Sequence, residues 1–239
     1  MRKLAAALFV LLFLLSACSS AAEISSSLST VLPSQSESEG STVIIPVLPS
    51  KLPNYNAAKD QNADTGGWLY IPGVGIDTVV MHTEDNNDYL RTNFYGAYDV
   101  WGVPFIDQYC APNAQGRNTI VYGHSSQSGR GFGALFQYRD PAFAAENQFI
   151  QLTTAAGDGI YLIFSVFVTL GEGVGIFDYT QTDFISDADY QEFIETAVAK
   201  SEIDFAIYPD PGSRVLTLQT CAYDYDGARF VVMALEINN

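Results

Sequence analysis

Short runs of apolar and β-branched residues, separated by turn residues, predict a chain made mainly of β-strands. Each run is rich in Val, Ile, Thr, Phe or Tyr and is bounded by Gly, Pro, Asn or Asp. The predicted strands lie at residues 68–71, 76–82, 103–107, 118–122, 149–153, 160–169, 215–221 and 229–232. Many short strands with few helices are typical of a β-barrel or another β-rich fold.

The strand at 160–169 is expected to be central in its sheet. Strand alternation places the odd-numbered side chains from Tyr161 to Thr169 on one face and the even-numbered ones from Leu162 to Val168 on the other. Both faces are largely apolar, which favours a strand that is covered on both sides over an edge strand.

A helix is predicted between the strand that ends near Thr169 and the strand that ends at Cys221. Ser186 and Asp189 form a variant of the capping box. Apolar side chains then recur at helical spacing as far as Lys200, and they are Tyr190, Phe193, Ile194, Ala197 and Val198. A shorter helix is expected at 132–138, and residues 53–61 can form a short helix that leads into the domain.

The N-terminus has the pattern of a targeting segment. Met1-Arg2-Lys3 precedes an apolar run from Leu4 to Leu15, which predicts a signal peptide. The run is too short to span a bilayer, which needs about 20 residues. Leu15-Ser16-Ala17-Cys18 resembles a bacterial lipobox, which implies cleavage before Cys18 and lipid attachment to it. An uncleaved anchor or a signal peptide cut elsewhere remains open.

Composition divides the rest of the chain into a tether and one folded domain. We expect residues 1–17 to be the signal peptide, 19–64 a flexible Ser-rich linker and 65–239 the folded domain. Hydrophobic residues make up 48 % of the chain, enough for a sizeable core. The net charge of -16 argues against nucleic-acid binding, which needs a basic face.

Cys221 is the candidate nucleophile. It is expected at the end of one strand, and Arg229 at the start of the next, with a turn at 224–227 between them. A cation near a thiol lowers its pKa, and the thiolate is the reactive species. Three Cys do not make a disulfide framework. Cys110 could pair with Cys221, but pairing would disable the nucleophile, so we expect Cys110 to be a free thiol without a catalytic role.

The chain has two His, which are the candidates for a general acid or base. His124 falls at the mouth of the strand at 118–122, directly after Gly123. His82 competes with it but adjoins a polar segment, 83–88, and is the weaker candidate. Two distant His and no close Cys pair argue against a zinc site, and we expect neither a metal nor a cofactor.

The motifs TLQTC (217–221), Arg229-Phe-Val-Val and NTIVYGH (118–124) together resemble those of the sortases, class B most closely. The resemblance spans about Gly67 to Ile237. It implies a sortase-type β-barrel with added helices, one of them between the strand ending near Thr169 and the Cys221 strand. The lipobox departs from the uncleaved membrane helix that most sortases have. Either anchor would place the protein on the extracytoplasmic face of the cell membrane.

The resemblance also implies a cysteine transpeptidase and its site. Cys221 would attack a C-terminal sorting signal of a secreted protein and form a thioacyl enzyme, with His124 as acid and base. Arg229 would stabilise the oxyanion or hold the substrate, and Thr220 would line the substrate site. The acceptor would be an amine of a peptidoglycan precursor or of a pilin subunit. Asp224 is assigned to the turn, and three Ser after His124 are assigned to a loop: Ser125, Ser126 and Ser128.

Two other functions stay open at this stage. A papain-like cysteine peptidase would hydrolyse cell-wall peptides, but such enzymes place Cys before His, and here His124 precedes Cys221. A lipoprotein binding module could keep a sortase-like barrel without activity, although the presence of His, Cys and Arg together argues against it. Added amine distinguishes a transpeptidase, which yields a ligated product, from a peptidase, which only cleaves.

Overall fold

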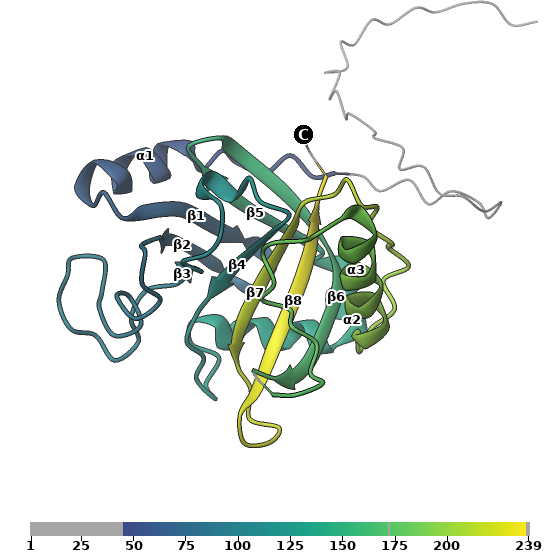
Figure 1. Ribbon diagram of the computed structural model, residues 1–239. Coiled ribbons are helices and arrows are strands. Elements are labelled where there is room, and N and C mark those ends of the chain that lie inside the picture. Colours follow the sequence, from purple (N-terminus) through teal and green to yellow (C-terminus); the bar gives the residue numbers. More distant parts are fainter. Residues whose placement is uncertain (1–44, 172, 238–239) are drawn as a thin grey trace, which may run out of the picture. The chain divides into compact units, whose positions relative to one another are not determined.

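A computed structural model describes residues 45–171 and 173–237. The predicted signal peptide at 1–17, the lipidation site Cys18 and the first part of the linker, up to residue 44, lie outside the described residues. A compact unit begins at Leu48. In this unit eight strands form a closed barrel, which confirms the prediction of a mainly β fold (Figure 1).

The barrel strands follow the predicted runs closely. They are β1 Thr65–Ile71, β2 Ile76–Met81, β3 Phe105–Ile106, β4 Asn118–Tyr122, β5 Phe149–Thr154, β6 Gly157–Leu170, β7 Val215–Cys221 and β8 Ala228–Glu236. Their order around the barrel is β1-β2-β3-β4-β7-β8-β6-β5, and pairing of β1 with β5 closes it. The pairs β2–β3 and β4–β7 are parallel, and the others are antiparallel.

Apolar side chains from the strands fill the interior of the barrel. The strands alternate between the interior and the outer face, so that β1 shows a strict two-residue pattern of burial. Burial of each such side chain contributes about 1.5–3 kcal/mol relative to exposure. Fully buried members of this core include Leu69, Ile71, Val80, Ile120, Leu216, Leu218, Phe230 and Val232.

The long strand β6 is covered on both faces, as predicted, but its faces are not the predicted ones. A β-bulge shifts its register against β8 between Ile163 and Ser165. Ile163 and Val166 therefore both belong to the interior core, whereas Ser165 and Phe167 face outward. A bulge inserts one extra residue, so simple alternation fails beyond it.

Three α-helices and three short 3-10 helices lie among the described residues. They are α1 Leu52–Gln61, α2 Pro141–Glu146, α3 Asp187–Lys200, η1 Pro72–Val74, η2 Pro112–Ala114 and η3 Phe132–Arg139. The predicted helix after β6 is confirmed as α3, and Ser186 caps it by accepting a hydrogen bond from the Asp189 amide at 3.1 Å. None of the helices in the described ranges is long and apolar enough to cross a membrane.

Helix α3 covers the outward face of β6 (Figure 1). The Ser165 hydroxyl donates to the carbonyl of Ala197 at 2.6 Å, which ties the strand to the helix. Apolar and aromatic side chains fill the space between them, including Phe167, Phe177, Phe184, Tyr190 and Phe193. The outer layer explains why both faces of β6 are apolar in sequence.

The boundary predicted at residue 65 is too late. Residues 48–64, assigned to the flexible linker, belong to the compact unit. Helix α1 packs against β1 and β5, and two of its side chains, Tyr55 and Ala58, are buried. The remaining residues of the helix are exposed and mostly polar. The composition of this segment is therefore similar to that of a flexible linker.

A buried amide, Asn118, joins the barrel to the segment between β6 and α3. Its Nδ2 donates to the carbonyls of Tyr179 and Gln181 at 3.0 and 2.9 Å, and its Oδ1 accepts from the Thr217 hydroxyl at 2.7 Å. The side chain has no exposure to solvent. A buried amide is tolerated only when its polar atoms are hydrogen-bonded, and here both of them are.

Cys110 lies in the core as a free thiol. Its sulfur accepts a hydrogen bond from the Ile120 amide at 3.2 Å. Burial raises the pKa of this thiol to about 12. Cys221, by contrast, is an exposed free thiol, so the two are not joined in a disulfide.

Replacing Asn118 by Ala should lower the free energy of unfolding by about 3 kcal/mol, because unpaired buried polar groups cost about 1–3 kcal/mol each. The hydroxyl of Thr217 and two carbonyls would lose their partner. Urea denaturation followed by circular dichroism measures the change. Asn56→Ala, at an exposed position of α1, serves as control and should stay within about 0.5 kcal/mol. A similar change in both variants would contradict the role of Asn118.

Iodoacetamide at pH 8 should modify Cys221 and leave Cys110 unmodified in the folded protein. Alkylation requires the thiolate, and the raised pKa of Cys110 leaves that thiol protonated at this pH. Peptide mapping by mass spectrometry of the full-length chain locates the label. In urea both thiols should react, which shows that the protection of Cys110 depends on folding. Equal labelling of the two in the native protein would refute this assignment.

Candidate active site

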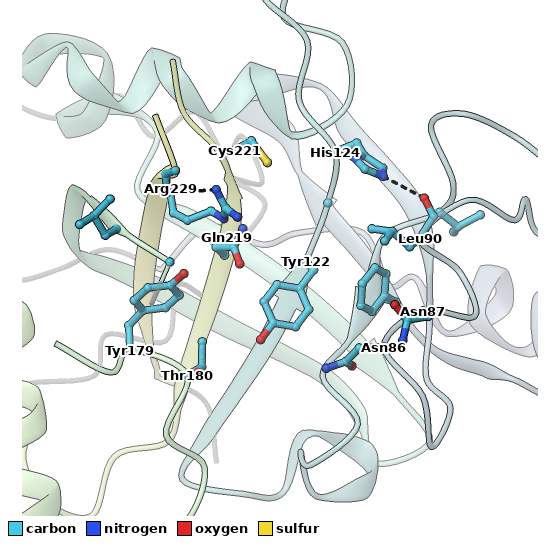
Figure 2. A pocket seen from close by; sticks show the side chains of 16 residues that line it. Asn86, Asn87, Leu90, Tyr122, His124, Tyr179, Thr180, Gln219, Cys221 and Arg229 are labelled. Atoms are coloured by element: carbon cyan, nitrogen blue, oxygen red, sulfur yellow. Dashed lines mark hydrogen bonds between the residues drawn. The ribbon is translucent and has the colours of Figure 1, made fainter. Parts of the chain in front are cut away.

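A cavity of about 580 Å³ lies at the end of the barrel where β4 and β7 end and β8 begins. Because β4 and β7 are parallel, the residues that follow β4 and those that end β7 meet at the same edge. Figure 2 shows the cavity from close by. Its lining includes Asn86, Leu90, Tyr122, His124, Tyr179, Thr180, Gln219, Cys221 and Arg229.

Cys221 is the last residue of β7 and faces the cavity. It pairs directly with Arg229 of β8. Residues opposite each other in an antiparallel pair have Cβ atoms about 4.5–5.5 Å apart on the same face. The sulfur points toward the side of the cavity on which His124 lies (Figure 2). The strand pairing thus places Cys221 and Arg229 side by side at the cavity.

Arg229 presents an uncompensated charge to the cavity. Its Nη1 donates to the carbonyls of Gly227 and Ala228 at 3.2 and 3.1 Å. In ranges 45–171 and 173–237, no carboxylate forms an ion pair with it. The two main-chain bonds fix the guanidinium at the cavity wall, and its remaining donors can reach a bound group.

His124 lies at the opposite side of the cavity mouth (Figure 2), two residues after the end of β4. Its Nε2 is 2.8 Å from the carbonyl of Leu90. A carbonyl oxygen only accepts hydrogen bonds, so Nε2 carries the proton in this contact. Gly123 leaves room for the ring of Phe132, since a Cβ at this position would lie 2.5 Å from that ring. The amide of Phe132 donates to the His124 carbonyl at 2.9 Å and holds the main chain.

Thr220 lies outside the cavity lining. Strand alternation directs Gln219 and Cys221 to one face and the side chain between them to the other. Thr220 is fully buried, and its hydroxyl donates to the carbonyl of Gly123 at 2.6 Å. The structure therefore gives Thr220 a hydrogen bond to the residue before His124, and its predicted role in binding substrate stays a prediction.

Several residues that line the cavity are not among the site residues predicted from the sequence. Gln219 could have been found, because it shares the face of Cys221 in the predicted strand, and Tyr122 belongs to the YGH segment. Leu90 and Tyr179 come from long segments, 82–104 and 171–186, that have no periodic pattern. Their place at the cavity depends on contacts between residues distant in sequence.

Two tyrosines supply neutral hydroxyls near the site. Tyr122 donates to Asp107 Oδ2 at 2.9 Å, and the Asn86 amide donates to the same oxygen at 2.9 Å. Burial raises the pKa of Tyr122 well above its ordinary value, and burial raises that of Tyr179 to about 12. Both groups therefore remain protonated at physiological pH.

The competing candidates lie elsewhere. His82 does not line the cavity, and burial lowers its pKa below the ordinary value. The Asp224 carboxylate accepts from Arg139 Nη1 at 2.9 Å, which agrees with its exclusion as a partner of His124. The described residues contain no group of three or more His, Cys, Asp or Glu side chains that could hold a metal ion.

Comparison with known proteins identifies the family. A family model for the sortase domain matches residues 69–237. Sortase B of Staphylococcus aureus (strain NCTC 8325 / PS 47) is 29 % identical over 184 residues, covering 76 % of this chain and 74 % of the relative. Sortase B of Listeria monocytogenes (serovar 1/2a) is 27 % identical over 173 residues, covering 72 % and 69 %.

Solved structures agree with these relatives. The Staphylococcus aureus sortase B–substrate complex aligns with a TM-score of 0.71 at 28 % identity, covering 78 % of this chain and 85 % of that one. Clostridium perfringens sortase B aligns with a TM-score of 0.70 at 28 % identity, covering 77 % and 99 %. The predicted resemblance and barrel are thereby confirmed: the chain belongs to the sortase family, in its class B, and is a sortase-type cysteine transpeptidase.

Proposed function

We propose that the enzyme cleaves a C-terminal sorting signal of secreted proteins through a thioacyl intermediate on Cys221 and joins the protein to an amine. The observation that carries the proposal is the convergence of three side chains on one cavity. His124 follows β4, Cys221 ends β7 and Arg229 lies at the start of β8. These neighbouring strands supply a nucleophile, an acid–base group and a cation.

The first half-reaction forms the acyl enzyme. The Cys221 thiolate attacks a backbone carbonyl carbon of the signal, and the new S–C bond places a negative charge on the carbonyl oxygen. Arg229, with no carboxylate partner among the described residues, donates to that oxygen. The C–N bond then breaks, and the leaving amine takes a proton from His124.

The second half-reaction transfers the acyl group. An acceptor amine attacks the thioester carbonyl, loses a proton to His124 and expels the Cys221 thiolate. The product is an amide, and the enzyme returns to its starting state. The acceptor is an amine of a peptidoglycan precursor or a pilin lysine. No metal or cofactor takes part in either half-reaction.

We place this reaction on the extracytoplasmic face of the cell membrane. The support is the N-terminal pattern: a basic start, an apolar run and a lipobox that ends at Cys18. In this arrangement a lipid on Cys18 anchors the enzyme, and the Ser-rich segment after it separates the barrel from the bilayer. Secreted substrates and peptidoglycan precursors are available at that surface.

The full-length Cys221→Ala variant should form no acyl adduct and no product. Wild type and variant are incubated with a panel of sorting-signal peptides of the LPxTG and NPxTN kinds and followed by intact mass. Cys110→Ser is the matched control, since it removes the other thiol of the barrel and leaves the cavity unchanged, and it should retain the adduct.

An amine acceptor in the same assay separates the two enzyme classes. A ligated peptide that appears only with added amine supports transpeptidation. Cleavage that is indifferent to amine supports a hydrolysing peptidase. If no peptide yields an adduct on the folded wild type, while Cys221 still reacts with iodoacetamide, the proposed signals are wrong.

Arg229→Gln should lower the rate of acyl-enzyme formation about 10²–10³-fold, the usual cost of removing an oxyanion donor. Arg229→Lys keeps the charge but loses the planar fork of donors, so its rate should fall between wild type and the Gln variant. Single-turnover kinetics measure the acylation step directly. An Arg229→Gln variant that acylates at the wild-type rate would exclude Arg229 from the chemistry.

A further inference from the structure

The backbone ladder between β4 and β7 stops just before the two reactive residues. Its register pairs Tyr122 with Gln219, and the amide of Gly123 donates to the Gln219 carbonyl at 3.1 Å. In a parallel ladder, alternate residues of a strand bond to the same neighbour through both N–H and C=O. If the ladder continued, the carbonyl of Gly123 and then the carbonyl of Cys221 would accept its next two backbone hydrogen bonds.

Two side-chain hydroxyls bond to these same two carbonyls. Thr220 Oγ1 donates to the Gly123 carbonyl at 2.6 Å, and Ser125 Oγ donates to the Cys221 carbonyl at 2.7 Å. The bonds are reciprocal: the residue before Cys221 holds the residue before His124, and the residue after His124 holds Cys221. The hydroxyls thus continue the ladder beyond the end of β4.

Ser125 is well placed to act as a fixed point. Only 9 % of the residue is exposed. The hydroxyl of Tyr223, two residues after Cys221, donates to the Ser125 carbonyl at 3.0 Å. The main chain of Ser125 also forms an isolated bridge with Gly131. The Ser125 position is therefore held both by its own loop and by the turn that follows the nucleophile.

We propose that Ser125 is a positioning residue, which with Thr220 sets the separation of the His124 imidazole from the Cys221 thiol. The inference rests on the proposed function and deepens it, since it assigns a role to a residue that the sequence places merely in a loop. Ser125 touches the Cys221 main chain and no reacting atom. It is expected to act on the chemical step, because a misplacement of about 1 Å can cost about 10²-fold in rate.

Ser125→Ala should lower the single-turnover acylation rate about 10–100-fold and change KM by less than about twofold. Ser125→Thr retains a hydroxyl and should recover most of the rate. Ser128→Ala is the matched control, an exposed serine of the same loop whose hydroxyl contacts Ser126. All are measured in the full-length chain, with thermal unfolding as the check that each variant is folded at the assay temperature.

A second measurement needs no peptide substrate, so it separates failure of this inference from failure of the proposed function. The rate of Cys221 alkylation by iodoacetamide is followed against pH. Loss of the fixed His–Cys separation should alter the pH profile in Ser125→Ala, and the Thr variant should restore it. A Ser125→Ala profile that matches Ser128→Ala would overturn the inference, even if no peptide is ever turned over.

A double-variant cycle with Thr220→Val tests whether the two hydroxyls act together. If both set the same separation, the combined variant should lose much less rate than the product of the two single losses. Independent, multiplicative losses would refute a shared role. An effect confined to KM, or a Thr variant as slow as the Ala variant in a folded protein, would also refute it.

Discussion

Parallel pairing of β4 with β7 is the constraint on which the site depends. These strands are distant in sequence, and no turn connects them, so the pairing is secured by the buried residues along it. Asn118 pairs with Val215 at one end of the register, and Tyr122 pairs with Gln219 at the other. The register therefore leads to His124, just beyond the end of β4, and to Cys221, the last residue of β7. A slip of one residue would turn Cys221 to the opposite face.

The walls of the cavity come from two long segments, and each is tied to the barrel by a polar side chain. The Asp107 carboxylate after β3 accepts from Asn86, which holds the segment between β2 and β3 that includes Leu90. Asn118 in β4 bonds the carbonyls of Tyr179 and Gln181. Burial of polar groups is costly unless they are hydrogen-bonded. Removing either partner of these contacts would therefore take a hydrogen bond from a buried polar group and destabilise the cavity wall. Irregular loops thereby acquire definite positions beside a regular ladder.

The strands and helix α3 could be predicted because local patterns specify them. Period-two runs gave the strands, and capping with helical spacing gave α3. The candidate site residues His124, Cys221 and Arg229 could be placed at strand ends for the same reason. Features that depend on distant contacts do not follow from the sequence: the carbonyl of Leu90 against His124, the place of Tyr179 in the cavity lining, and the two buried side chains that pack α1 against the barrel. The bulge in β6 does not follow from the sequence pattern either, because it depends on pairing with β8.

Beyond the end of β4, side-chain hydroxyls take the place of backbone donors. This replacement explains how the two main chains can diverge at this end of the barrel while His124 and Cys221 keep definite positions. A continued ladder would keep the two main chains about 4.8 Å apart and would leave no room for a peptide between them. A side chain adds reach, so the two main chains can lie farther apart after Tyr122 while the Gly123 carbonyl accepts from Thr220 and the Cys221 carbonyl accepts from Ser125. The strand order thus sets the direction of the two segments, and the hydroxyls set their distance. Where the ladder ends, the cavity begins, and His124 and Cys221 stand on its two sides.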